Sequence, residues 1–109
     1  MEHLHYRFMG GRTMRATRPC IVGVVASGNL EVLIEPAALQ GACTVDIDTA
    51  ANGFGVVWEA VVADFFSRHP LADVRISIND NGATPAVVAL RLDQAVVEFA
   101  AAAPTGPTA

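Results

Sequence analysis

One serine stands where another protein could reach its hydroxyl. Ser27-Gly28-Asn29 separates two β-rich runs, Cys20–Ala26 and Leu30–Glu35, and such small residues that tolerate positive φ are typical of a tight reversal. The sequence therefore predicts a β-hairpin with Ser27 at its tip, where the neighbouring glycine lets a partner approach the backbone closely. The hydroxyl is a candidate functional group, although turn serines are also common for their local hydrogen bonds.

The other reactive side chains favour structural roles, so we predict no catalytic residue. Ser27 lacks the two flanking glycines of a hydrolase nucleophile elbow. His69 stands beside Pro70 at a predicted helix end, where contact with the terminal carbonyls or with solvent is expected of it. Asp46 and Asp48 alternate along a predicted strand and should form its wet side, so no metal site is predicted.

Two cysteines, Cys20 and Cys43, lie in or beside strand-like runs of a chain without an export signal. We expect free thiols rather than a disulfide, and a cytoplasmic location. Charged and breaking residues interrupt every hydrophobic stretch before it reaches the ~18 residues of a membrane span, so no membrane partner is predicted.

The basic residues of the chain are arginines alone, and they are unevenly distributed. The absence of lysine excludes Schiff-base chemistry and the P-loop lysine. Residues 1–19 hold four arginines and one acid, whereas the remainder holds three arginines and ten acids. An acidic body repels phosphate backbones, so we predict no nucleic-acid partner.

Hydrophobic periodicity predicts a single domain with strands and two helices. Alternation marks further strands at Thr44–Asp48 and from Val74 to Asn79, the second ending at a turn-forming run. A helix with the core residues Phe54, Val57, Trp58, Val61 and Phe65 ends at Pro70, and a helix opened by Thr84-Pro85 carries the stripe Val88, Leu92, Ala95 and Phe99. The order βββαβα predicts an α+β fold, with two helices on one face of a mainly antiparallel sheet.

The N-terminal segment is predicted to differ from the rest. His3 to Phe8 alternates in polarity, which suits a short edge strand or an extended docking arm. We therefore divide the chain into a basic N-terminal arm (1–19), a compact domain (20–102) and a flexible tail (103–109).

Several blocks of residues, spread over residues 1–103, resemble one known family. They are Glu2–Phe8, Val22–Pro36, Gly53–Gly55, His69–Asp80 and Gly82–Pro85. In these blocks the chain resembles the acyl-carrier (delta) subunit of bacterial malonate decarboxylase. It is more distantly similar to the gamma subunit of citrate lyase, in its serine near a strand end and its Asn-Asp-x-Gly-Ala-like turn.

The resemblance implies a covalent arm on Ser27. In the family the matching serine carries phosphoribosyl-dephospho-CoA through a phosphodiester, so Gly28 and Asn29 would complete the attachment loop. Ala26 and Asn29 depart from the family pattern, in which glycine precedes the serine and Gly-Asp follows it. The fold expected is not the four-helix bundle of ordinary acyl-carrier domains.

The resemblance also implies a non-catalytic carrier that serves other subunits. An acetyl thioester on the arm would exchange with malonate to give a malonyl thioester and acetate, and decarboxylation would regenerate the acetyl form. The implied partners are the acyl-transferase and decarboxylase subunits, a malonyl transferase, and the prosthetic-group transferase that installs the arm. One alternative is a non-catalytic protein-interaction subunit of a larger complex with an unmodified Ser27, and another is a carrier of the citrate lyase type.

Overall fold

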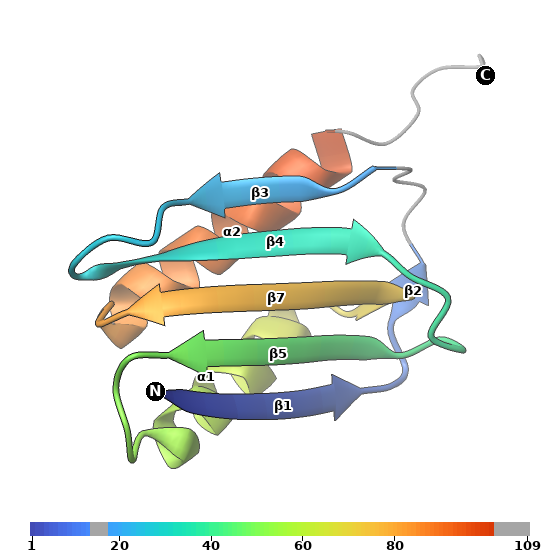
Figure 1. Ribbon diagram of the computed structural model, residues 1–109. Coiled ribbons are helices and arrows are strands. Elements are labelled where there is room, and N and C mark those ends of the chain that lie inside the picture. The colour runs from blue at the N-terminus through green and yellow to red at the C-terminus, as the bar shows by residue number, and fades with distance from the viewer. Residues whose placement is uncertain (14–17, 102–109) are drawn as a thin grey trace.

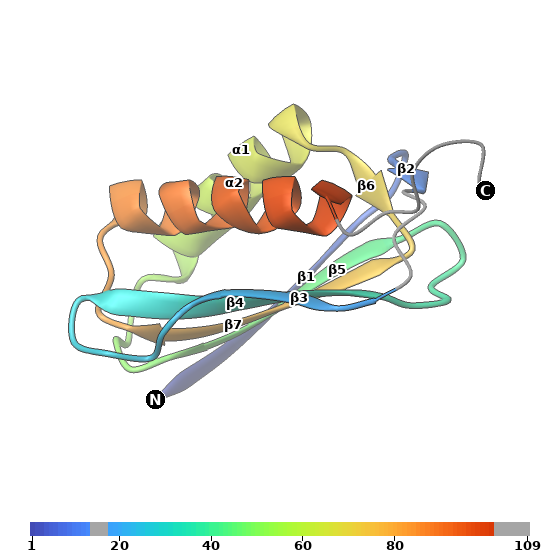
Figure 2. The ribbon, with the colours of Figure 1, turned by 90° about the horizontal axis from the view of Figure 1, so that it is seen from above.

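The computed structural model describes residues 1–13 and 18–101, and its centre is one five-stranded sheet. Both helices, α1 (Gly55–Arg68) and α2 (Pro85–Ala101), cover the same face of that sheet (Figures 1 and 2). The predicted α+β class with a mainly antiparallel sheet is confirmed. The strands, in their order across the sheet, are β1 (Glu2–Phe8), β5 (Cys43–Thr49), β7 (Val74–Asn81), β4 (Asn29–Pro36) and β3 (Cys20–Gly23).

One neighbouring pair of strands in this sheet is parallel. β5 and β7 run in the same direction, whereas the pairs β1·β5, β4·β7 and β3·β4 are antiparallel. Parallel neighbours need a crossover connection, and α1 supplies it. A second, two-stranded parallel pair joins β2 (Arg12–Thr13) to β6 (Leu71–Ala72).

The core lies between the sheet and the two helices. Alternate residues of the central strands face the helices and are fully buried, including Leu30, Val32, Ile34, Val45, Ile76 and Ile78. The predicted stripe of α2 (Val88, Leu92, Ala95 and Phe99) is buried against them, and the hydroxyl of Thr84 accepts a hydrogen bond from the Val87 amide. The predicted start and buried face of α2 are thus confirmed.

The buried face of α1 is narrower than its apolar pattern predicts. Trp58 and Phe65 belong to the core, as does Val62, which the predicted stripe omitted. Phe54 and Val57 are instead 51% and 41% exposed. They line a groove between the two helices, because the sheet covers only part of the apolar surface of α1.

The alternation of residues 3–8 suited either a short edge strand or an extended docking arm. The structure shows the edge strand, β1. It pairs with β5 along all seven of its residues, from Glu2 to Phe8. Tyr6 donates a hydrogen bond to the carbonyl of Gly55 at 3.1 Å, and Phe8 stacks on Phe66 with ring centroids 4.9 Å apart.

The sheet therefore includes residues that we had placed in a basic arm. The expected boundary between residues 19 and 20 does not separate this strand from the sheet, since pairing with β5 satisfies its backbone. Part of that arm (residues 14–17) and the predicted tail (103–109) lie outside the described residues.

Candidate functional site

The loop that holds Ser27 is longer than the tight reversal that the sequence predicted. β3 ends at Gly23 rather than continuing to Ala26, so residues 24–28, here called the Ser27 loop, connect it to β4. Gly23 has φ +85°, and a Cβ atom at this position would lie 2.2 Å from the carbonyl oxygen of Leu30. This positive φ and the close backbone approach end the strand three residues early.

Ser27 occupies the outer corner of a β-turn within this loop. The Asn29 amide donates to the Ala26 carbonyl at 2.9 Å, which closes a four-residue turn. Gly28 has φ +73°, which suits the third position of a type II turn, where a positive φ is required. Ser27 is therefore the second residue of the turn, and its side chain is exposed.

Further hydrogen bonds tie the end of the loop to β7 and α2. The Gly28 amide donates to the Asn81 carbonyl at 2.8 Å, tying the loop to the end of β7. The side-chain oxygen of Asn29 accepts from the Leu30 amide at 2.8 Å and from the Arg91 Nε at 3.2 Å. The Ser27 hydroxyl makes no hydrogen bond within the described parts of the chain.

The surface before Ser27 is apolar although it faces solvent. The side chains of Ile21, Val24 and Val25 are each more than half exposed. Nothing lies within 4 Å of a Cβ atom built on Gly28. The loop therefore has room around Ser27 for a bulky substituent.

Beside the Ser27 loop, the chain leaves β7 through a turn held by a buried carboxylate. Asp80 is 6% exposed and accepts hydrogen bonds from the Thr49 hydroxyl at 2.8 Å and from the Ala83 amide at 3.0 Å. A third bond, at 3.3 Å, comes from the amide of Gly82. We call residues 80–83 the Asp80 turn, and these bonds give Asp80 a structural role.

An apolar groove of about 250 Å³ opens next to the Asp80 turn. Its walls come from the N-terminal halves of both helices and from the turns that precede them. In both views, the Ser27 loop lies at the same end of the sheet as the turn that leads from β7 to α2 (Figures 1 and 2). The lining residues are Ala51, Phe54, Val57, Trp58, Val61, Asp80, Gly82, Ala83, Pro85 and Val88.

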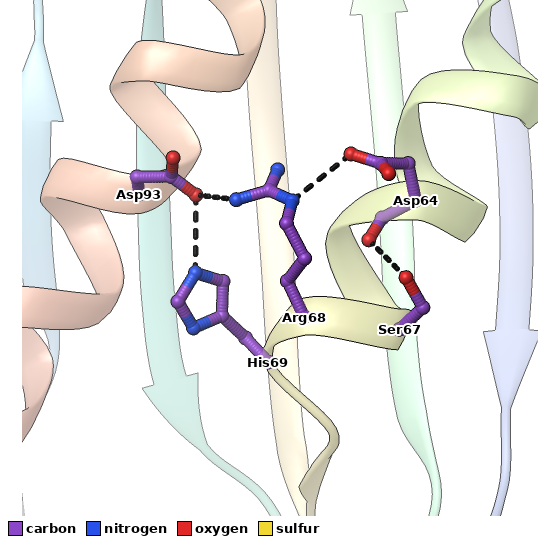
Figure 3. A network of polar contacts seen from close by, with 5 residues as sticks. All are labelled: Asp64, Ser67, Arg68, His69 and Asp93. Carbon is purple, nitrogen blue, oxygen red and sulfur yellow. Dashed lines mark hydrogen bonds and ion pairs between the residues drawn. The ribbon is translucent and has the colours of Figure 1, made fainter.

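His69 lies in a polar network that joins the two helices (Figure 3). Its Nε2 is 3.1 Å from a carboxylate oxygen of Asp93, which also accepts from Arg68. The imidazole thus contacts a side chain, whereas the sequence predicted contact with the terminal carbonyls or with solvent. Burial alone would raise the pKa of Asp93, but the hydrogen bonds from Arg68 and His69 outweigh it and lower that pKa. The Ser67 hydroxyl donates to the Asp64 carbonyl, away from the imidazole, so the network holds no activated serine.

The acids of β5 lie on the open face of the sheet, as their alternation predicted. Asp46 contacts His5 and Asp48 contacts His3, in both cases directly across the β1·β5 pair. Within residues 1–13 and 18–101 there is no group of three or more side chains arranged to hold a metal ion. In the same part of the chain, no helix is long and apolar enough to cross a membrane.

Both cysteines carry free thiols, as the sequence predicted. Burial raises the pKa of the Cys43 thiol to about 11. Burial also raises the pKa of Cys20, and the negative charge of Glu98 adds to the shift. Neither thiol is therefore activated as a nucleophile at neutral pH.

Comparison with known proteins shows the family of the chain. The family model described as malonate decarboxylase delta subunit (MdcD) matches residues 17–99. The malonate decarboxylase acyl carrier protein of Stenotrophomonas maltophilia strain K279a is 65% identical over 105 residues, covering 95% of this chain and 99% of the relative. The protein of the same name from Burkholderia cepacia is 61% identical over 100 residues, covering 92% of each chain.

A solved structure agrees with these sequence matches. A chain in the crystal structure of a Pseudomonas malonate decarboxylase hetero-tetramer in complex with malonate superposes with a TM-score of 0.80 at 39% identity. The match covers 91% of this chain and 99% of that one. The fold and the sequence thus agree, and the chain belongs to the malonate decarboxylase delta subunit family of acyl carrier proteins.

Proposed function

We propose that this protein is the acyl-carrier subunit of a cytoplasmic malonate decarboxylase, with a phosphoribosyl-dephospho-CoA arm attached to Ser27 through a phosphodiester. The observation that carries the proposal is the position of Ser27. Its hydroxyl lies exposed at the corner of a turn, in a chain of the carrier family. The arm, when bound, supplies a thiol that holds acetyl and malonyl groups as thioesters.

The residues around Ser27 fit such an attachment. The hydroxyl is free of hydrogen bonds to the described residues, and the space beside Gly28 is open. The base of the loop is nevertheless fixed, because Gly28 is bonded to Asn81 and Asn29 to Arg91. This combination presents the serine to a modifying enzyme while the sheet holds its position.

The protein would then contribute position, while its partners contribute chemistry. A tethered thioester meets each partner active site at a high effective concentration, of order millimolar for flexible links. The partners that we propose are the acyl-transferase and decarboxylase subunits, a malonyl transferase, and a dedicated prosthetic-group transferase.

The intact mass of the protein purified from its own host tests this proposal. We expect an added mass equal to phosphoribosyl-dephospho-CoA, with or without acetyl, that disappears in a Ser27→Ala variant. Ser77→Ala, on the open face of the sheet, is the matched control and should keep the added mass. A native chain of unmodified mass would overturn the proposal and favour a protein-interaction subunit without an arm.

A further inference from the structure

One arginine of α2 lies against the base of the Ser27 loop. The Arg91 Nε donates to the side-chain oxygen of Asn29, directly after the loop. Its Cδ would lie 3.4 Å from a Cβ atom built on Gly23, directly before the loop. Arg91 therefore bonds to the residue after the five-residue loop that displays Ser27, and its side chain lies beside the residue before that loop.

Among the residues that the structure describes, the guanidinium of Arg91 has unused N–H donors and no ion-pair partner. A guanidinium carries five N–H donors, and two of those of Arg91 are used, for Asn29 and for the side-chain oxygen of Gln94 at 3.0 Å. Both of these acceptors are neutral amides. By contrast, Arg68 pairs with Asp64 and Asp93, and Arg75 pairs with Glu35.

Within residues 1–13 and 18–101, Arg91 has no carboxylate within ion-pair distance. Its side chain is also half-buried. Removing a cation from water costs free energy unless an anion or hydrogen-bond acceptors compensate for the lost hydration. The remaining N–H groups are therefore suited to an anion that arrives at the Ser27 loop.

We propose that Arg91 binds the phosphodiester of the prosthetic arm and thereby orients its first link. This inference rests on the proposed function, because that function puts a phosphodiester on Ser27. Only Gly28 separates Ser27 from Asn29 along the chain, so their Cα atoms are at most about 7.6 Å apart. Arginine forms paired, charge-assisted hydrogen bonds with phosphate oxygens. Arg91 is thus a positioning residue for the arm, and it takes no part in the chemistry at the distant thiol.

A thermodynamic cycle between Arg91 and the arm tests the proposal. Wild type, Arg91→Gln and Arg75→Gln are each prepared with and without the arm, the state of each is verified by intact mass, and thermal unfolding is followed. Arg75 is the matched control, since it pairs with Glu35 toward the opposite end of the sheet. We expect the arm to raise the melting temperature of wild type and Arg75→Gln by about 3 °C and to leave that of Arg91→Gln unchanged.

A second measurement needs no variant at position 91. In ¹⁵N-labelled wild type, rotation of the Arg91 guanidinium about its Nε–Cζ bond should slow about tenfold when the arm is attached, as expected if charge-assisted hydrogen bonds hold it. Equal rotation rates with and without the arm would overturn the role of Arg91, even if the arm is present by mass.

The outcomes separate this inference from the function beneath it. An arm that stabilises Arg91→Gln as much as wild type refutes the contact with Arg91 and leaves the carrier function intact. A wild-type protein without added mass from its own host refutes both.

Discussion

The Ser27 loop and the Asp80 turn lie side by side at one end of the sheet, joined by the hydrogen bond from Gly28 to Asn81. Their polar side chains are used in opposite ways. Asp80 is buried and accepts three hydrogen bonds, whereas Ser27 is exposed and bonds to no described residue. At this end of the sheet, Asp80 therefore supports the fold, whereas Ser27 is available to other molecules.

This comparison also gives a physical meaning to the Asp80 turn. The run Asn79-Asp80-Asn81-Gly82-Ala83 could be taken for part of an acidic active site. Its carboxylate instead satisfies the buried hydroxyl of Thr49 and two backbone amides. Asp80 thus fixes the strand end against which the Ser27 loop is bonded.

The largest expected effect is on function, from the change Ser27→Ala. We expect malonate decarboxylation by the assembled complex to fall to background, because the chain would have no site for the arm. Since Ser27 is exposed, the free energy of unfolding should stay within about 0.5 kcal/mol of wild type. Turnover assays and urea unfolding measure the two quantities, with Ser77→Ala as the control. If the Ser27→Ala complex retained turnover, Ser27 would not be the residue that this end of the sheet uses for function.

The next largest effect is on stability, from the change Asp80→Ala. It leaves the Thr49 hydroxyl and two turn amides without their acceptor, which should cost about 3 kcal/mol of unfolding free energy. Urea unfolding measures this loss. Asp46→Ala is the control, because Asp46 is exposed on the open face and should cost less than about 1 kcal/mol. Equal stabilities of the two variants would contradict the structural role of Asp80.

Two glycines, Gly23 just before the Ser27 loop and Gly28 at its end, should differ in how well they tolerate a side chain. Gly23→Ala would force a Cβ atom to 2.2 Å from the Leu30 carbonyl oxygen, so the paired strands must shift. Gly28→Ala meets no neighbour and carries only the cost of a positive φ, about 1 kcal/mol. We expect thermal unfolding to rank Gly23→Ala as clearly less stable than Gly28→Ala. The reverse order would mean that the positive φ at Gly28, rather than the close backbone approach at Gly23, has the larger effect on stability.

Local patterns predicted the elements whose determinants are close in sequence. Thr84-Pro85 and the stripe from Val88 to Phe99 specified α2, because a cap and a 3.6-residue period are encoded within one segment. The turn-forming residues around Ser27 marked it only as a candidate, and its role as an attachment site was implied by the family resemblance. The end of β3 was misplaced because Val24 and Val25 have strand-forming side chains, whereas the break is set by the backbone at Gly23.

Contacts between distant segments could not be predicted in this way. Asn29 and Arg91 are 62 residues apart, and the sequence around either residue does not predict their contact. The parallel pairing of β5 with β7 likewise depends on where α1 packs. Asp80 is an intermediate case, since a turn was expected there but the buried partner Thr49 lies 31 residues away.

The smallest change in stability is expected at Asp73, a second carboxylate that accepts three hydrogen bonds, as Asp80 does. Its carboxylate accepts from the Gly41 amide at 2.9 Å, from the Thr13 hydroxyl at 3.0 Å and from the Leu39 amide at 3.2 Å. These hydrogen bonds, that from Gly41 foremost, lower the pKa of Asp73. A lowered pKa gives stability that is present above the ordinary value near ~4 and is lost as pH falls through the folded value.

Asp73→Asn should therefore flatten the decline of the melting temperature between about pH 5 and pH 2. Asparagine tolerates the positive φ of 57° at this position, so the change tests the charge rather than the backbone. Ser27→Ala should follow the wild-type curve throughout, because its hydroxyl bonds to no described residue. Parallel curves for Asp73→Asn and wild type would show that the bonds to Asp73 do not depend on its charge. Asp73 would then add no pH dependence to the melting temperature, as is expected of Ser27.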